Sequence, residues 1–442
     1  MKVSSLFFSP VISAIVLGIV ACAAPGVRAA TPFLETNDLF VAAPGDYYHI
    51  PGLVVTSKGT VLAYAAWRQK ETHDWGNIKV HLRRSTDGGK TWDAIHQVAP
   101  QGDPVQAIVR SSPPKPKGHE DDVTVDNGVM IADRNGAVHM LYCVEYRRVF
   151  YMRSDDDGVT WSTPKEISKV FENYRPEINW KIVATGPGHG IQLNNARLEV
   201  PVWLATGSKT GYSHQPSMAA MTFSDDHGAS WHTGDIVART TGLGTNPAVY
   251  HNPNETEAVQ LADGSVMFII RAPSAHQRKV FSLSPNGATD WSKPQFVEDL
   301  PEPVNFGSIR RLSKKPTSDK NRLLYSITGS LETRRAKSPD EKSCKREDMT
   351  VFLSYDEGQT WPVKKIMQQG PAGCGYSDLA VLPDGTILCA HGAGAGFGSG
   401  ARIALARFNL EWLTDGRDSV PQGTADPGVV QGGRAPASPS PQ

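Results

Sequence analysis

Short apolar runs alternate with polar turn sequences along most of the chain, and no long segment shows the period of an amphipathic helix. The segments VHLRRSTDGGKTW and MTVFLSYDEGQTW each place β-branched or aromatic residues before a turn that contains Asp and Gly, with a Trp after it. Such a run, followed by a turn and a new apolar start, is typical of two strands joined in a hairpin. The pattern therefore predicts an all-β protein.

The turn sequence is an internal repeat with the pattern Ser-x-Asp-x-Gly-x-Thr/Ser-Trp. Four copies begin at Ser85, Ser154, Ser224 and Ser354, and a degenerate copy, SPNGATDW, begins at Ser284. Asp or Asn accepts hydrogen bonds from the N–H groups of a turn, Gly supplies the positive φ, and the Trp ring is buried as the next strand starts. The alternating ligands and distal Glu of a calcium loop are missing. We therefore interpret these Asp-boxes as scaffold rather than as ligand sites.

The spacing of the boxes predicts the architecture. Successive copies start 69, 70, 60 and 70 residues apart, which allows about one pair of hairpins per interval. Four-stranded sheets repeated in this way around a central channel form a β-propeller. The 373 residues from Phe40 to Trp412 allow about 62 residues for each of six blades. We predict a six-bladed β-propeller over residues 40–412, with the boxes at the blade rims.

The two ends of the chain depart from this pattern. Lys2 precedes an apolar stretch from about Leu6 to Ala21, so residues 1–29 are interpreted as an export signal. Cleavage near residues 27–29 and lipid modification at Cys22, in the lipobox-like sequence Ile-Val-Ala-Cys, both remain open. No other apolar segment is long enough to span a bilayer, so we expect an exported protein that is periplasmic, secreted or lipid-anchored. Residues 417–442 are rich in Gly, Pro, Ser and Ala and are predicted to be a disordered tail.

Charge and cysteine content exclude several classes of partner. The 442 residues carry 45 basic and 45 acidic side chains without a long run of one sign, so no nucleic-acid-binding or anionic-membrane surface is expected. The cysteines outside the signal are scattered without CxxC spacing, and HExxH is absent, so no metal or cofactor is implied. His189 in GPGHGIQL is expected to line a pocket or to be hydrogen-bonded in a loop rather than to bind a metal. The oligomeric state stays open.

Several segments together resemble the bacterial exo-sialidases, or neuraminidases, which carry Asp-box (BNR) repeats. They are the boxes, an x-Ile-Pro-x-Leu strand near the start, and NETEAVQLADGSVMFIIR, GPGHGIQLNNARLEVPVW and GYSDLAVLPDGTIL. The similarity covers almost all of residues 47–412. The resemblance implies a six-bladed propeller that hydrolyses terminal sialic acids with retention of configuration. It also implies a Tyr nucleophile paired with a Glu, an Asp acid/base, and three Arg that hold the substrate carboxylate.

The resemblance assigns catalytic roles to three residues. Asp74, eleven residues before the first box, matches the acid/base, Glu255 in NETEAVQ matches the partner of the nucleophile, and Tyr376 in GCGYSDL matches the nucleophile. A Tyr hydroxyl with a pKa near 10 is a poor nucleophile at neutral pH, so it needs a base in contact. The anomeric carbon of sialic acid carries a carboxylate, which repels a carboxylate nucleophile but not a neutral Tyr.

The resemblance also implies residues that bind substrate. Arg271 in FIIR and Arg346, eight residues before the last box, match two of the three Arg, and Arg68 in YAAWRQK matches an Arg that the family often keeps beside the pocket. Guanidinium groups bind carboxylates through two parallel hydrogen bonds.

One pair departs from the family pattern. His49 stands where the family has its first Arg, and the chain has His391 and Gly392 where the family commonly has a Tyr-Glu pair whose Glu braces that Arg. Neighbouring Arg side chains disfavour a protonated His, so we expect His49 to be neutral and to offer one donor.

Three functions are compatible with these residues. The leading hypothesis is an exported retaining exo-α-sialidase-type glycoside hydrolase that acts on sialylated or other acidic glycans. A uronate-type polysaccharide lyase is the second, because a His and a Tyr beside two Arg are also a set that can abstract the C5 proton of a uronate. A glycan-binding propeller without catalysis is the third, and the retained Tyr and Glu argue against it.

Overall fold

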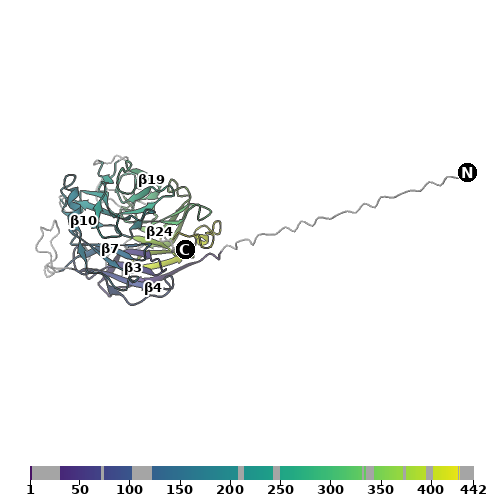
Figure 1. Ribbon diagram of the computed structural model, residues 1–442, viewed down its shortest axis with the longest axis horizontal. Helices are drawn as coiled ribbons and strands as arrows, with labels where there is room; N and C mark the ends of the chain where they lie inside the picture. Colours follow the sequence, from purple (N-terminus) through teal and green to yellow (C-terminus); the bar gives the residue numbers. More distant parts are fainter. Residues whose placement is uncertain are drawn as a thin grey trace, which may run out of the picture.

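The computed structural model describes Met1 and residues 30–70, 74–101, 122–207, 214–241, 249–330, 333–334, 343–371, 375–394, 402–426 and 428. Within these residues the strands form six antiparallel blades, as the sequence predicted (Figure 1). The inner strands of successive blades contact one another in a closed ring, in which the third blade meets the fourth through its second strand, and this is the arrangement of a β-propeller.

Each blade begins with its innermost strand. Blade 1 contains β2 (Tyr47–Val55), β3 (Val61–Arg68), β4 (Ile78–Ser85) and β5 (His96–Gln97). Blade 2 contains β6 (Val125–Ala132), β7 (Val138–Val144), β8 (Arg148–Ser154) and β9 (Lys165–Glu166). Blade 3 contains β10 (Ile182–Thr185), β12 (Leu198–Ala205), β13 (Ser217–Ser224) and β14 (His232–Thr233). Two short strands, β11 (Ile191–Gln192) and β15 (Ala238–Arg239), extend blade 3. A 3-10 helix, η1 (Ser168–Tyr174), follows blade 2.

Blades 4 to 6 repeat the order. Blade 4 contains β16 (Thr256–Gln260), β17 (Val266–Ile270), β18 (Arg278–Ser284) and β19 (Gln295–Pro301). Blade 5 contains β20 (Ser308–Ser313), β21 (Arg322–Thr328), β24 (Glu347–Ser354) and β25 (Val363–Pro371). Blade 6 contains β26 (Ser377–Val381), β27 (Ile387–Ala393), β28 (Arg402–Phe408) and β1 (Leu34–Phe40). A small hairpin of β22 (Thr333–Arg334) and β23 (Ser343–Cys344) is inserted in blade 5.

Blade 6 closes the ring. Its outermost strand is β1, which pairs with β28 from Leu34 opposite Phe408 to Phe40 opposite Ile403. The propeller therefore begins at Leu34, six residues before the predicted boundary. An apolar cluster that includes Leu39, Leu53 and Leu405 joins blade 6 to blade 1.

The Asp-boxes lie where the third strand of a blade turns into the fourth, in blades 1 to 5. In one box the Asp156 carboxylate accepts hydrogen bonds from the Thr160 N–H at 2.8 Å and the Thr160 hydroxyl at 2.5 Å, and the Ser154 hydroxyl accepts from the Gly158 N–H at 2.9 Å. Because the carboxylate bonds groups of its own turn, the geometry agrees with the interpretation of the boxes as scaffold.

The chain continues past β28 through α1 (Leu410–Leu413) and packs against the rim of blade 5. The Asp418 carboxylate accepts hydrogen bonds from Arg322, at 2.8 Å to both Nε and Nη2, and from the Tyr355 hydroxyl at 2.9 Å. Val420 and Ala425 pack against the apolar cluster between blades 5 and 6. The prediction of a disordered tail from Arg417 is therefore wrong for residues 417–426, because a buried ion pair and apolar contacts anchor them.

The other terminal predictions lie outside the described residues. This holds for the export signal, for Cys22 and for residues 429–442. In the part of the chain that the structure describes, no helix is long and apolar enough to cross a membrane. Cys143, Cys344 and Cys389 are buried free thiols, and Cys374 is not among the described residues.

Candidate active site

The residues singled out from the sequence meet at one end of the inner strands. In an antiparallel blade, the starts of the first and third strands and the end of the second lie at the same edge. Their positions follow this rule: His49 lies near the start of β2, Glu255 and Tyr376 directly precede β16 and β26, Arg346 directly precedes β24, Arg271 follows β17, Arg68 ends β3, and Asp74 lies between β3 and β4. The propeller therefore gathers them at one mouth of the central channel.

Tyr376, Glu255 and Arg271 form a tightly connected group. The Tyr376 hydroxyl donates to Glu255, with distances of 2.5 and 2.6 Å to Oε1 and Oε2, and accepts a hydrogen bond from Arg271 Nη1 at 2.7 Å. Arg271 also forms an ion pair with Glu255. Burial raises the pKa of Tyr376 well above its usual range, and Glu255 adds to this effect while Arg271 opposes it. The phenol therefore keeps its proton in the resting site, and Glu255 is placed to accept it.

His49 lies beside this group because of a bulge in β2. Pairing with β3 shifts register between His49 and Gly52, and Ile50 has a φ of 54°, which is unusual for a β-branched residue. A Cβ at Gly52 would lie 2.1 Å from the Tyr64 ring, so the bulge requires glycine there. The His49 ring centroid lies 4.4 Å from that of Tyr376.

His49 is neutral in this environment. Burial lowers its pKa well below the usual range, and Arg68, Arg346 and Arg271 act in the same direction, whereas Asp74 opposes them. The direction agrees with the expectation from the sequence. It also shows that the site residues are close enough to act on one another electrostatically.

Arg68 lies behind Asp74. The Arg68 side chain is 1% exposed and donates to Asp74 at 2.9 Å and to Asp126 at 3.0 Å, whereas the Asp74 side chain is 44% exposed. Partial burial opposes ionisation of Asp74, but Arg68 and His214 outweigh it and hold the pKa of Asp74 well below its usual range. The structure therefore places Arg68 as a support for Asp74 rather than at the open surface of the site.

Arg346 and Gly392, the residue at the position of the family's bracing Glu, complete the site. Arg346 Nε donates to the Pro303 carbonyl at 3.3 Å, and its Nη2 donates to the Val304 carbonyl. The Gly392 N–H donates to the Tyr376 carbonyl at 2.9 Å. Gly392 thus lies directly beside Tyr376, where it has no side chain to brace a cation.

Trp75 belongs to an aromatic wall beside Asp74, and its other members, Tyr146, Trp203 and His214, were not identified from the sequence. Trp75 lies 5.0 Å from Tyr146 and 4.8 Å from His214, and the His214 ring lies 5.1 Å from that of Trp203, all measured between ring centroids. The Nδ1 atom of His214 is 3.8 Å from Asp74 Oδ2. These residues come from four segments in blades 1, 2 and 3, and their spacing in the sequence matches no motif.

A second cluster of polar side chains lies deeper in the channel, and the sequence did not indicate that its members are in contact. His189 Nδ1 lies 2.7 Å from Asp378 Oδ1 and 2.9 Å from Glu257 Oε1. Asp378 also accepts hydrogen bonds from the Leu53 N–H at 2.7 Å and from the Ser308 hydroxyl at 2.9 Å. The contacts connect inner strands β2, β16, β20 and β26. Three of these strands carry candidate site residues at their starts, so the cluster holds those residues in register.

His189, Glu257 and Asp378 are close enough together to consider a metal ion. Burial disfavours a charged His189, but the two carboxylates outweigh it and raise the pKa of His189 to about 9. The Nδ1 atom is therefore protonated and donates to the carboxylates, and Glu257 Oε2 accepts from the Ile309 N–H at 2.7 Å. The cluster is an ion pair, and His189 is hydrogen-bonded in a loop, as the sequence indicated.

Comparison with known proteins agrees with this architecture. The chain matches the BNR repeat-like domain family over residues 63–389. It is 28% identical over 403 residues to the sialidase of Micromonospora viridifaciens, covering 88% of this chain and 56% of the relative. It is also 28% identical over 376 residues to Sialidase-2 of Cricetulus griseus, covering 81% of this chain and 91% of the relative. The chain thus spans about half the length of the bacterial relative.

Solved structures share the fold. A Hadza microbial sialidase has a TM-score of 0.64 at 21% identity, covering 83% of this chain and 66% of that one. The intramolecular trans-sialidase from Ruminococcus gnavus has a TM-score of 0.64 at 18% identity, covering 86% and 98%. A six-bladed propeller with a buried Tyr and Glu and a partly buried Arg at one channel mouth defines a class of glycoside hydrolase scaffold. Together with the family match, it shows that the chain belongs to the sialidase family with BNR repeats.

Proposed function

We propose that the chain is a retaining exo-α-sialidase-type glycoside hydrolase that removes terminal sialic acid, or a related acidic sugar, from glycans. One observation carries the proposal: the Tyr376 hydroxyl contacts both oxygens of Glu255, at 2.5 and 2.6 Å. A phenol that is buried with its own base serves nucleophilic catalysis, because simple binding of a sugar does not require such a pair.

The reaction has two steps. In the first, the Tyr376 oxygen attacks the anomeric carbon while its proton passes to Glu255, and Asp74 gives a proton to the departing glycosidic oxygen. In the second, water attacks the same carbon, Asp74 takes its proton, and Tyr376 leaves and recovers a proton from Glu255. Two displacements restore the original anomeric configuration.

Substrate recognition relies on cations beside Tyr376. Arg271 and Arg346 are the groups that attract the substrate carboxylate, and the neutral His49 replaces a third cation with a single donor. A charge-assisted hydrogen bond contributes about 1.5–3 kcal/mol, so the exchange costs roughly 10- to 100-fold in affinity for a carboxylate. Such a cost leaves catalysis possible and favours a remodelled pocket for the sugar.

Asp74 must be protonated when the first step begins, although Arg68 favours its ionised form at rest. Substrate binding brings a second negative charge beside Asp74 and covers a side chain that is 44% exposed in the open site. Both changes raise the pKa of a carboxyl group. Asp74 therefore becomes a better acid when the substrate is bound.

Hydrolysis of an aryl α-sialoside, and of a panel of other acidic glycosides, tests the proposal. We expect turnover with release of the α-anomer, observed by NMR before mutarotation, and its loss in Tyr376→Phe. Tyr355→Phe is the matched control, since Tyr355 lies at the rim of blade 5 and bonds Asp418. If the folded wild-type protein turns over none of the glycosides, or if Tyr376→Phe keeps full activity, the proposal fails.

The two alternatives predict other products. A uronate lyase would release an unsaturated sugar that absorbs in the ultraviolet, and His49 beside Tyr376 is the observation that favours it. However, the Tyr376 hydroxyl is already bonded to Glu255, which suits nucleophilic attack better than proton abstraction. A glycan-binding propeller would retain acidic glycans without any product.

We also propose that the protein acts outside the cytoplasm. The support is the sequence of residues 1–29, which has the charge, apolar stretch and small residues of an export signal. Mass spectrometry of the mature N-terminus tests this and separates cleavage near residues 27–29 from lipid attachment at Cys22.

A further inference from the structure

A cavity of about 410 Å³ lies at the far mouth of the channel, opposite the candidate active site. The inner strand β2 runs from His49 at the site to Val54 and Val55 in the cavity wall, and β16 ends at Gln260 in the same wall. At about 3.3 Å per residue, the six residues from His49 to Val55 span roughly 20 Å. The cavity is therefore separate from the site of the proposed reaction.

Basic side chains dominate the charge of this cavity. Arg134, Arg310, Arg311 and Lys314 line it, and Asp426 is the single acidic side chain among its described lining residues. Glu357 lies 3.0 Å from Arg311 Nη1 and 2.5 Å from Nη2. Four basic side chains against one acidic side chain give the described lining a net positive charge.

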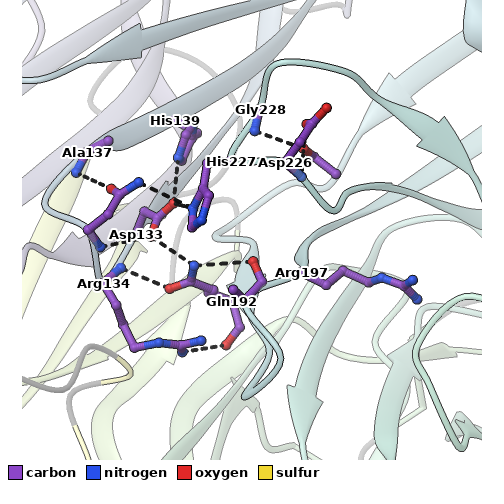
Figure 2. A network of polar contacts seen from close by, with 12 residues as sticks. Asp133, Arg134, Ala137, His139, Gln192, Arg197, Asp226, His227 and Gly228 are labelled. Carbon is purple, nitrogen blue, oxygen red and sulfur yellow. Dashed lines mark hydrogen bonds and ion pairs between the residues drawn. The ribbon is translucent and has the colours of Figure 1, made fainter.

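One of these cations is held in place by a network of polar contacts (Figure 2). The Arg134 guanidinium donates to the Gln192 carbonyl at 3.4 Å and to the Leu193 carbonyl, and the backbone N–H of Arg134 donates to Gln192 Oε1 at 2.9 Å. Gln192 Nε2 in turn donates to Asp133 at 2.8 Å. His139 and His227 also contact Asp133, at 3.2 and 2.6 Å. The wall of the cavity is therefore ordered before any ligand binds, which reduces the entropic cost of binding.

One residue of the cavity lining carries a buried donor. His189 lines the cavity and is 1% exposed, and its Nδ1 is occupied by the carboxylates of Glu257 and Asp378. Its Nε2 has no hydrogen-bond partner among the described residues. A protonated imidazole carries a hydrogen on each nitrogen, so Nε2 is a buried N–H donor that lacks an acceptor.

The C-terminal segment places a carboxylate at this mouth. The Asp426 N–H donates to the Leu312 carbonyl at 2.8 Å, and Asp426 Oδ1 accepts from the Gly428 N–H at 2.9 Å. Burial lowers the pKa of Arg310 and of Arg134, and Asp426 opposes this in both cases. The Asp426 carboxylate is thus within electrostatic range of both cations.

We propose that the far mouth of the channel is a second ligand site, for a small organic carboxylate of about monosaccharide size. The Asp426 carboxylate competes with this ligand for the cations of the cavity. The cations select an anion, and the cavity lining includes His189, whose Nε2–H has no hydrogen-bond partner among the described residues. Apolar side chains of Val54, Val55, Ile131 and Ile309 form the rest of the wall, which favours an organic anion over an inorganic one. A volume of about 410 Å³ suits a ligand of this size.

The experiment uses the full chain with ¹⁵N-labelled histidine and compares glucuronate with glucose, its neutral counterpart. We expect glucuronate to shift the His189 Nε2–H resonance, identified by its loss in His189→Gln, and glucose to leave it unchanged. Calorimetry then gives the affinity for each variant. We expect Arg310→Gln to weaken glucuronate binding by about 10- to 100-fold and Asp426→Asn to strengthen it by about tenfold.

Arg271→Gln is the matched control for binding at the candidate active site. Glucuronate that still shifts the His189 resonance in Arg271→Gln supports the second site. Binding that Arg271→Gln abolishes and Arg310→Gln leaves intact belongs to the active site and overturns the proposal. The absence of any shift in both the wild type and Asp426→Asn, or inorganic phosphate binding as tightly as glucuronate, overturns it as well.

Discussion

The ion pair of His189 with Glu257 and Asp378 predicts that stability falls as pH rises. The pKa of His189 is raised from its ordinary 6.5 to about 9. Its contribution to stability is therefore complete below pH 6.5 and is lost as pH rises through about 9. Burial also raises the pKa of Glu257, to about 7, so its contribution is lost in the same direction.

The size of the effect follows from the same shift. Each tenfold change in proton affinity corresponds to about 1.4 kcal/mol, so His189 contributes about 3 kcal/mol to folding near neutral pH. In His189→Gln the buried carboxylates lose their cation, a change that typically costs about 3–5 kcal/mol. We expect the stability difference between wild type and His189→Gln to be largest near pH 6.5 and to shrink by about 3 kcal/mol at pH 10.

Urea unfolding at several pH values, followed by tryptophan fluorescence, measures this difference. His232→Gln is the control, because His232 is exposed on β14 and its loss should leave the stability curve parallel to that of the wild type. Groups that do not contact His189 titrate alike in both proteins and cancel in the comparison. A difference between wild type and His189→Gln that does not change with pH would refute the ion pair.

Three further predictions concern the site and the scaffold. His49→Arg alone should destabilise the protein, because it adds a cation at a buried position near Arg68, Arg271 and Arg346. The added change Gly392→Glu should recover stability and strengthen sialoside binding by about 10- to 100-fold, measured by urea unfolding and by KM. Asp74→Ala should lower kcat/KM by about 10²- to 10⁴-fold for a natural sialoside but much less for an aryl sialoside, whose leaving group needs no proton; equal losses would exclude the acid role. Asp156→Ala removes contacts of one Asp-box and should cost about 1–3 kcal/mol in unfolding free energy while kcat/KM stays the same, and an unchanged stability would contradict the scaffold role.

The fold could be predicted because its signal is periodic. Four boxes have an Asp and a Gly at fixed spacing to close the turn, and the degenerate fifth has Asn286 and Gly287, so the boxes mark the outer hairpin of five blades. Blade 6 has no box, and its prediction followed from dividing the length by six and from the family resemblance. Its outer strand, β1, precedes blade 1 in the sequence, and no local pattern indicates that this strand pairs with β28.

The site was only partly predictable. Glu255 and Tyr376 lie in motifs of their own, and the structure brings them together across 121 residues of sequence. Asp126 and His214 contact the site through folded geometry alone, so no spacing indicates them. His189 lies 189 residues from Asp378, and only the closed ring shows that it is an ion-pair partner.

The C-terminal segment shows the limit of composition. Residues 417–426 lack large apolar side chains apart from Val420, so composition indicates disorder. The segment is anchored by Asp418, which contacts Arg322 on β21. A single buried ion pair of this kind has no signature in the local sequence.

The central claim is that Tyr376 attacks the anomeric carbon. The most direct measurement uses a 2,3-difluoro analogue of sialic acid, in which the fluoride at the anomeric carbon leaves readily and the second fluorine slows hydrolysis of the intermediate. After incubation, peptide mass spectrometry should find the sugar bound to Tyr376 in the wild type and to no residue in Tyr376→Phe. A sugar attached to another residue, or turnover of sialosides without any trapped adduct, would contradict the account.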